Sequence, residues 1–243
     1  MTKYVVWDFD GTLAHRPAGW RGAVLEAVRA AGVVCNASLE NVGPFLQSGF
    51  PWHQPDVIRE IRGDPDEWWA ALEPVFERAI RSLTQADAGT AALVARRVRD
   101  AYTSPTSWSL YGDTRPVLDA LSRAGWVQLV LSNHVPELSA ICTTLGLSPY
   151  FARIFNSAET GVEKPHPRAF RQVLDVVPYG SPVWMVGDSL HADVLAAEAA
   201  GIKAILVRSV HPQAERCCLS LTDALAMLTA PDAVILPAAP PPD

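Results

Sequence analysis

The stretch Val5-Val6-Trp7-Asp8-Phe9-Asp10-Gly11-Thr12-Leu13 is the part of the sequence around which the chain is organised. The apolar run that ends at Trp7 is typical of a strand buried on both faces. Because side chains alternate along a strand, Asp8 and Asp10 are expected to leave its carboxyl end on the same side. Two carboxylates placed in this way repel each other unless a cation lies between them, and Gly11 permits a sharp turn or a close approach to a ligand. Taken alone, the stretch is equally consistent with an Asp-rich turn.

The composition excludes several classes of protein. Of the 243 residues, 49% are hydrophobic, which is enough for a sizeable core and too many for a disordered chain. The net charge of −6, without a basic stripe, argues against nucleic acid or an anionic membrane as a partner. No signal-peptide pattern or membrane-spanning apolar run is present, so we expect a cytoplasmic protein. The cysteines lack ligand-like spacing and are expected to be reduced thiols: Cys35, Cys142, Cys217 and Cys218.

Residues 15–107 are predicted to form a helical insertion. The clearest helix begins after Asp64-Pro65, a pair that suits an N-cap followed by the first helical position, and its apolar residues recur at helical spacing as far as Leu83. The insertion is rich in aromatic residues, which we expect to form its core more readily than a surface for stacking on a base. These residues are Phe45, Phe50, Trp52, Trp68 and Trp69.

Strands and helices alternate from about Tyr111 onward. Apolar strands are predicted at 126–131, 183–186 and 202–207, with a shorter one at 154–155. Repeated βα units imply a parallel sheet with helices on both faces, so the predicted fold is α/β, a Rossmann-like doubly wound parallel sheet with an inserted helical subdomain. The predicted boundaries are 1–14 and 108–229 for the α/β core, 15–107 for the helical insertion, and 230–243 for a proline-rich tail that we expect to be disordered.

Polar residues follow the predicted strands at their carboxyl ends. Ser132-Asn133 ends the second strand and Asp188 a later one, and in a parallel sheet such ends share the edge at which ligands bind. Lys164 lies in another loop and is one of only 3 lysines against 17 arginines; its compact charge suits a tight phosphate site. Each residue has a structural explanation of its own, as a helix cap or a solvated charge, but their joint appearance favours a site.

In their order and residue types these clusters resemble the motifs of the haloacid dehalogenase superfamily, specifically of its phosphatase-like branch with a helical, C1-type cap. The resemblance extends over the whole predicted core, and the insertion at 15–107 is similar to the helical cap of that family. The matching stretches are Asp8-Phe9-Asp10-Gly11-Thr12, Ser132-Asn133, Lys164-Pro165 and Gly187-Asp188-Ser189-Leu190-His191-Ala192-Asp193.

The resemblance implies a Mg²⁺-dependent phosphatase that hydrolyses a small-molecule phosphomonoester through an aspartyl-phosphate. Asp8 would be the nucleophile, and Asp10 would protonate the leaving alcohol and then activate water. Mg²⁺ would be held by Asp8, by the main-chain carbonyl of Asp10 and by Asp188, since hard oxygen ligands suit this ion. Asp193 is expected to orient metal-bound water or Lys164 rather than to bind the metal directly.

The remaining matched residues are assigned to the phosphoryl group by the same resemblance. Ser132 would hydrogen-bond a phosphoryl oxygen, assisted by backbone N–H groups near Asn133 and in the Asp10-Gly11 turn. Lys164 would neutralise the charge that develops on the transferring group.

The same residues distinguish between alternative activities. True dehalogenases of the superfamily lack the second acid, Asp10, and phosphonate-cleaving members use a cap lysine, whereas residues 14–107 contain no lysine. A phosphomutase shares the core residues and stays open as an alternative, as does a non-catalytic module that binds phosphate or a metabolite. The substrate is not specified: His15, Arg16 and Arg21 either meet a second anionic group of the substrate or are solvated linker residues.

Overall fold

The computed structural model describes residues 1–59 and 64–230. The described chain forms two compact units: residues 1–15, 55–59 and 110–230 make up the first, and residues 16–54 and 64–109 the second. The short segment 55–59 groups with the first unit although it comes between two parts of the second. The predicted disordered tail lies, from residue 231 on, outside the described residues. No helix in the described ranges is both long enough and apolar enough to cross a bilayer.

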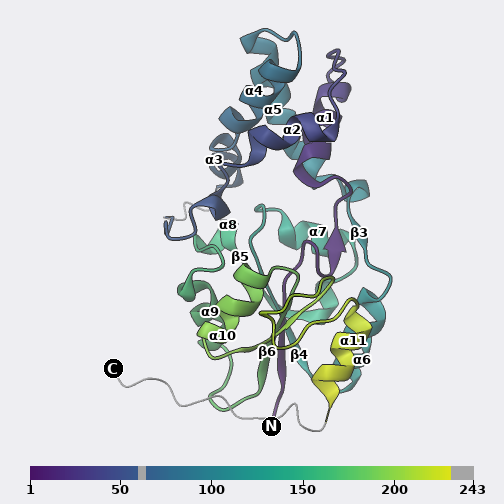
Figure 1. Cartoon of the computed structure of the whole chain (residues 1–243), viewed down its shortest axis with the longest axis vertical. Coiled ribbons are helices and arrows are strands. Elements are labelled where there is room, and N and C mark those ends of the chain that lie inside the picture. Colours follow the sequence, from purple (N-terminus) through teal and green to yellow (C-terminus); the bar gives the residue numbers. More distant parts are fainter. Residues whose placement is uncertain (60–63, 231–243) are drawn as a thin grey trace. The chain divides into compact units, whose positions relative to one another are not determined.

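A five-stranded parallel sheet forms the centre of the first unit, in the order β5-β4-β1-β6-β7 (Figure 1). Its strands are β1 (Tyr4–Trp7), β4 (Val127–Ser132), β5 (Phe151–Asn156), β6 (Val183–Gly187) and β7 (Lys203–Leu206). The strands that follow β1 in the chain add first on one side of it and later on the other, which makes the carboxyl end of β1 the switch point at which such sheets bind ligands. The predicted α/β fold with a doubly wound parallel sheet is confirmed.

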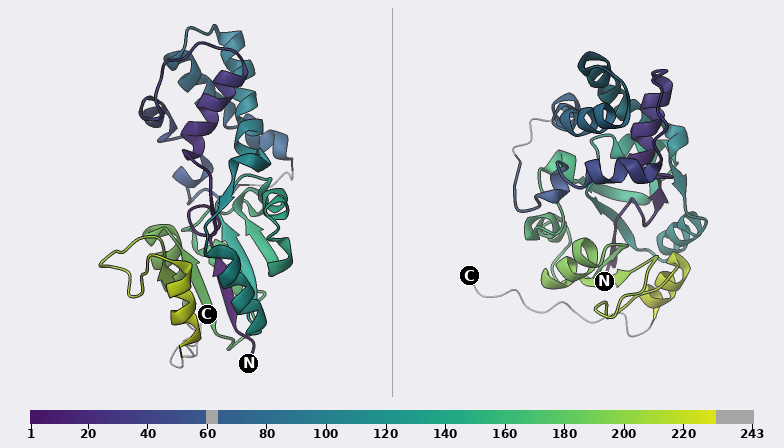
Figure 2. Two further views of the ribbon diagram at one scale, coloured as in Figure 1. Left: turned by 90° about the vertical axis from the view of Figure 1, so that its right-hand side faces the viewer. Right: turned by 45° about the horizontal axis from the view of Figure 1, so that its top comes forward.

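Helices cover both faces of this sheet (Figures 1 and 2). On one face lie α9 (Pro167–Leu174) and α10 (Ala196–Ala199), whose buried side chains join the core beside Val6. On the other face lie α6 (Thr114–Arg123) and α11 (Leu221–Thr229), which contact each other. The remaining helical segments of the unit are α7 (Leu138–Thr144), η4 (Ser148–Tyr150), α8 (Ser157–Thr160) and the π-helical η5 (Leu190–Leu195).

Strand β1 is buried on both faces, as its apolar sequence predicts. Val6 faces α9, whereas the next residue, Trp7, points to the α6 side, where its indole N–H donates to Gln128 Oε1 at 3.0 Å. Gln128 is buried in the neighbouring strand, and its amide nitrogen donates to the carbonyl of Leu118 at 2.9 Å. The buried polar atoms of this layer are therefore paired, as stability requires.

The second unit is helical. Its segments are α1 (Gly19–Ala30), α2 (Leu39–Val42), η1 (Gly43–Leu46), η2 (Pro51–His53), α3 (Pro65–Ala70), α4 (Glu73–Leu83), α5 (Ala88–Thr103) and η3 (Pro105–Ser107). Asp64 caps α3 as predicted, accepting from the N–H of Asp66 at 2.8 Å. The single helix predicted to run on to Leu83 is wrong, because Pro74 in the first turn of α4 has no N–H to donate and cannot continue the preceding helix. A separate two-stranded sheet pairs β2 (Ala14–His15) with β3 (Ser109–Leu110).

Aromatic rings form much of the core of the second unit. Trp20 stacks on Tyr102 with ring centroids 3.7 Å apart, and Phe50 and Trp69 are buried beside it. Arg16 is buried as well: its guanidinium pairs with Glu26 and donates to the carbonyl of Ala101 at 3.1 Å, which ties α1 to α5. Arg16 is therefore not the solvated linker residue that the sequence left open.

Candidate active site

Asp8 directly follows β1 and is fixed by the sheet. Its N–H donates to the carbonyl of Val186 in β6 at 2.9 Å, and the residue is only 6% exposed. The chain then turns back, with the N–H of Gly11 donating to the carbonyl of Ala14 at 2.8 Å. Gly11 has a φ of +86°, and a Cβ at this position would lie 2.3 Å from Asp188 Oδ2. Only glycine therefore allows this turn to pack against Asp188.

Two donors converge on one oxygen of Asp8. The hydroxyl of Ser132, the last residue of β4, donates to Asp8 Oδ1 at 2.9 Å, and the ammonium of Lys164 donates to the same atom at 2.8 Å. Burial alone would lower the pKa of Lys164, but the carboxylates of Asp193 and Asp8 hold this pKa above its ordinary value. Lys164 is therefore a fixed positive charge at neutral pH, and Asp8 is held in a single orientation.

Asp193 uses both of its oxygens inside the protein. Oδ1 accepts from Lys164 Nζ at 2.5 Å, and Oδ2 accepts from the N–H of Ser189 at 3.0 Å. The carboxylate folds against Gly187, where a Cβ would lie 2.3 Å from Asp193 Oδ2. The π-helical η5, which begins at Leu190, carries this side chain. These contacts suit the implied role of orienting Lys164 better than that of binding a metal.

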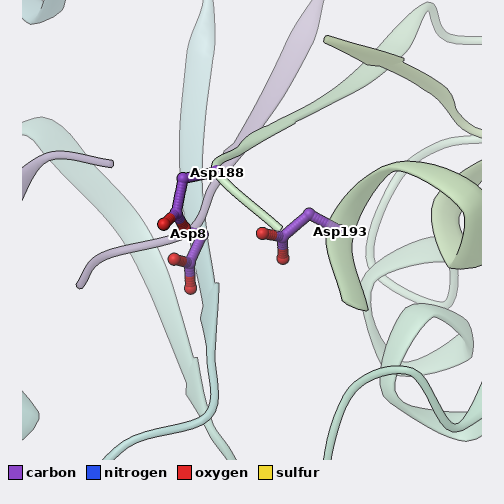
Figure 3. A group of neighbouring side chains, drawn as sticks. All are labelled: Asp8, Asp188 and Asp193. Carbon is purple, nitrogen blue, oxygen red and sulfur yellow. The ribbon is translucent and has the colours of Figure 1, made fainter. Parts of the chain in front are cut away.

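Asp8, Asp188 and Asp193 form an acidic cluster in which the ligand atoms lie within 4.8 Å of one another (Figure 3). When all three carboxylates are ionised, the one ammonium leaves two negative charges uncompensated. Burial and the charges of Asp8 and Asp193 raise the pKa of Asp188 to about 7. Asp188 is the partly exposed member of the cluster, so a cation can reach it. Hard oxygens with excess negative charge are a donor set that fits Mg²⁺.

Asp10 lies in the same turn, and its charge also contributes to the raised pKa of Asp188. Its side chain is not one of the three carboxylates in the cluster, so a contribution to metal binding rests on its main-chain carbonyl, as the resemblance implies. His134, next along from Asn133, is buried with its ring 5.4 Å from that of Phe9, and burial lowers the pKa of this histidine to about 4. His134 is therefore neutral and leaves the charge of the site unchanged.

The side chain of Asn133, predicted to belong to the substrate-binding group, is turned toward the protein. Asn133 Nδ2 donates to the carbonyl of Lys164 at 2.8 Å, and the N–H of Lys164 donates to Asn133 Oδ1 at 2.7 Å. The predicted site residues Ser132 and Lys164 thus both contact Asp8 directly, whereas the side chain of Asn133 contacts the backbone of Lys164.

Arg208 contacts the turn after Asp10 and was not among the site residues predicted from the sequence. Its guanidinium makes two hydrogen bonds to Asp113, at 2.8 and 2.6 Å, and donates to the carbonyl of Thr12 at 3.1 Å. It also lies over the ring of Tyr111, 3.9 Å from the centroid. The sequence holds no local signal for this pairing, because the two partners are 95 residues apart.

Comparison with known proteins identifies the family of the chain. A family model described as haloacid dehalogenase-like hydrolase matches residues 2–201. The mouse haloacid dehalogenase-like hydrolase domain-containing protein 3 is 29% identical over 86% of this chain and 83% of its own length. A ribulose-1,5-bisphosphate 5-phosphatase of Halopiger xanaduensis is 29% identical over 85% of this chain and 84% of its own.

A solved structure shares the fold. The HAD-hydrolase YfnB of Bacillus subtilis, bound to magnesium, superposes with a TM-score of 0.72 at 19% identity, covering 94% of this chain and 99% of that one. Since the family model spans most of the sequence and the predicted motifs converge at one sheet edge, the chain belongs to the haloacid dehalogenase-like hydrolase family and is a hydrolase.

Proposed function

We propose that the protein is a Mg²⁺-dependent phosphatase that hydrolyses a small-molecule phosphomonoester through an aspartyl-phosphate on Asp8. The observation that carries the proposal is the convergence of Ser132 and Lys164 on Asp8 Oδ1 beside Asp188. With both donors on one oxygen, the contacts among described residues leave Asp8 Oδ2 open to another partner. A carboxylate held in this way is oriented for nucleophilic attack.

The metal would be held by Asp8, Asp188 and the carbonyl of Asp10. The fit is electrostatic: the ionised cluster carries two excess negative charges on hard oxygens, and burial together with the neighbouring carboxylates raises the pKa of Asp188. When bound, Mg²⁺ supplies charge neutralisation between an anionic nucleophile and an anionic ester.

The residues of this chain then divide the reaction between them. Asp8 attacks phosphorus while the ammonium of Lys164, which has three donors, and the single O–H of Ser132, which turns from Asp8 Oδ1 to the substrate, hold the phosphoryl oxygens. Asp10 donates its proton to the departing alkoxide and takes a proton from the water that hydrolyses the aspartyl-phosphate. A phosphate ester needs such an acid because an alkoxide is a poor leaving group, whereas a halide is not. The presence of Asp10 therefore favours ester hydrolysis over dehalogenation.

The relatives support the same choice of substrate class, since one of them is named a phosphatase of a sugar bisphosphate. The helical second unit is proposed to act as the cap that sets specificity within that class.

The test uses p-nitrophenyl phosphate with excess Mg²⁺ or with EDTA. The wild type is expected to release p-nitrophenol only with Mg²⁺, and Asp8→Asn to release none. Asp10→Asn should still release one equivalent of p-nitrophenol, whose departure needs no acid, and then stall by about 10²–10⁴-fold with a phosphoryl group on Asp8, detectable by mass spectrometry. Asp175→Asn, at an exposed surface pair, serves as the control. Steady turnover by Asp8→Asn would refute the proposal.

A further inference from the structure

We propose that Asn133 is a positioning residue whose side-chain amide sets the backbone of Lys164, so that the Lys164 ammonium and the Ser132 hydroxyl meet on the same oxygen of Asp8. The inference rests on the proposed function for the catalytic importance of Lys164. It assigns Asn133 a role through its neighbour and no contact with the substrate.

Lys164 lies in an irregular loop between α8 and α9, where no helix or strand pairs its backbone. Buried backbone groups need partners, and one side chain supplies both of them here. Asn133 Oδ1 accepts from the N–H of Lys164 at 2.7 Å, and Asn133 Nδ2 donates to its carbonyl at 2.8 Å. A carboxamide is the side-chain group that places an acceptor and a donor side by side, so neither aspartate nor alanine can replace this pair.

The contacts close a ring. Asp8 Oδ1 accepts from Ser132; Ser132 is joined by its peptide bond to Asn133; the Asn133 amide brackets the backbone of Lys164; and the Lys164 ammonium returns to Asp8 Oδ1. The end of β4 therefore determines the positions of both donors, one directly and one through the amide.

The ring matters because a lysine side chain cannot hold its own position. Its four-carbon stem is flexible, whereas the ammonium of Lys164 must sit between Asp8 and Asp193, where it is 3% exposed. If the backbone of Lys164 were displaced, its ammonium would shift relative to the oxygen of Asp8 to which it donates. A misplacement of about 1 Å in a catalytic group costs on the order of 10²-fold in rate.

The chain offers a matched control in Asn156, at the end of the neighbouring strand β5. This asparagine also brackets backbone groups with its amide, donating to the carbonyl of Val135 at 2.8 Å and accepting from the N–H of Ala158 at 3.2 Å. It ties the loop after β4 to the first turn of α8, and among the described residues it makes no hydrogen bond to Lys164. Loss of its amide should therefore affect stability without affecting Lys164.

The kinetic experiment compares Asn133→Ala and Asn156→Ala on p-nitrophenyl phosphate with Mg²⁺. We expect kcat of Asn133→Ala to fall by about 10–100-fold with KM changed by less than about threefold, since the ground-state contacts to substrate remain. Asn156→Ala should unfold at a lower temperature and keep kcat within about twofold. If Asn133→Ala does not fold, Asn133→Ser takes its place.

A double-mutant cycle separates positioning from direct contact. In a Lys164→Gln background, Asn133→Ala should change kcat by no more than about twofold, because its effect passes through the missing ammonium. A full additional loss in that background would overturn the proposal, since Asn133 would then act on the substrate or on the fold. An unchanged kcat in the single variant would overturn it as well.

A second readout does not depend on activity. The protein has three lysines, so acetylation by an amine-reactive ester, read by peptide mass spectrometry in EDTA, compares Lys164 with Lys3 and Lys203 in one sample. Lys164 should react at least about tenfold more slowly than Lys3 in the wild type and in Asn156→Ala, and faster in Asn133→Ala. If the wild type hydrolyses no phosphate ester, the proposed function fails, but the labelling comparison still tests whether Asn133 positions Lys164. Equal labelling of Lys164 in all three proteins would overturn that proposal.

Discussion

Replacing Asp188 by asparagine is expected to stabilise the metal-free protein. Burial and the charges of Asp8 and Asp193 raise the pKa of Asp188 from 3.8 to about 7. The folded protein thus binds this proton more tightly than the unfolded chain does. Stability is fully present below the unfolded pKa and is lost as the pH rises through the folded pKa near 7, because the carboxyl must then ionise among like charges.

The magnitude follows from the two pKa values. A rise from 3.8 to about 7 corresponds to about 4 kcal/mol of free energy of unfolding, at about 1.4 kcal/mol per pH unit. Since Asp188 is partly exposed, solvent screening reduces this figure, and we take about 2 kcal/mol. For a chain of this length, that amounts to about 4–8 °C in the unfolding temperature.

Calorimetry in EDTA at pH 8 and pH 5 measures the effect. Asp188→Asn should unfold several degrees above the wild type at pH 8 and above it by less than half that difference at pH 5, because the wild type loses this stability progressively as the pH rises from the unfolded pKa of 3.8 to about 7. Asp175→Asn, which removes an exposed charge, should not differ from the wild type at either pH. Saturating Mg²⁺ should reverse the order, because a ligand at 100 times its Kd adds about 2.7 kcal/mol to the wild type alone. If Asp188→Asn were less stable than the wild type in EDTA at pH 8, the conclusion that burial and like charges destabilise ionised Asp188 would be refuted.

Three further variants test other parts of the site. Gly11→Ala should lower kcat/KM for p-nitrophenyl phosphate by on the order of 10²-fold, because its Cβ would lie 2.3 Å from Asp188 Oδ2 and displace that carboxylate. Arg208→Met should lower the free energy of unfolding in urea by about 2–3 kcal/mol, since it leaves the half-buried Asp113 unpaired, and Asp113→Asn in the same chain should restore part of the loss. Glu163→Gln should raise the unfolding temperature at pH 8 but not at pH 4, because burial raises the pKa of Glu163 from 4.5 to about 7 and the wild type loses that stability as the pH rises between these values.

The sheet and the placement of its polar strand ends could be predicted from sequence because both depend on local patterns. The apolar run up to Trp7 is a strand buried on two faces, and Asp8, Ser132 and Asp188 follow strands whose carboxyl ends share an edge in any parallel sheet. Gly11 is also explained by a local rule, since a positive φ favours glycine.

Contacts between distant segments could not be predicted in the same way. No local pattern in the sequence predicts burial of Arg16, yet it is buried by a partner on α1 and a carbonyl on α5, 85 residues away. The side chain of Asn133 follows a strand end like the other site residues, but its direction depends on where the Lys164 loop lies. Local periodicity carries no information about either arrangement, because each depends on how elements already formed pack together.

The charges of the site explain why its parts must act together. Without a cation, ionised Asp8, Asp188 and Asp193 outweigh Lys164 by two negative charges, so the phosphate dianion of the proposed substrate would be repelled by the carboxylate proposed to attack it. Lys164 cannot correct this alone, because Asp193 already shares its charge. Asp193 in turn cannot be removed without losing one of the two carboxylates that hold the ammonium in place. The excess negative charge that makes the metal-free protein less stable at pH 8 is therefore the same charge that would bind a divalent cation. The loss of stability and the affinity for metal arise from one arrangement of carboxylates.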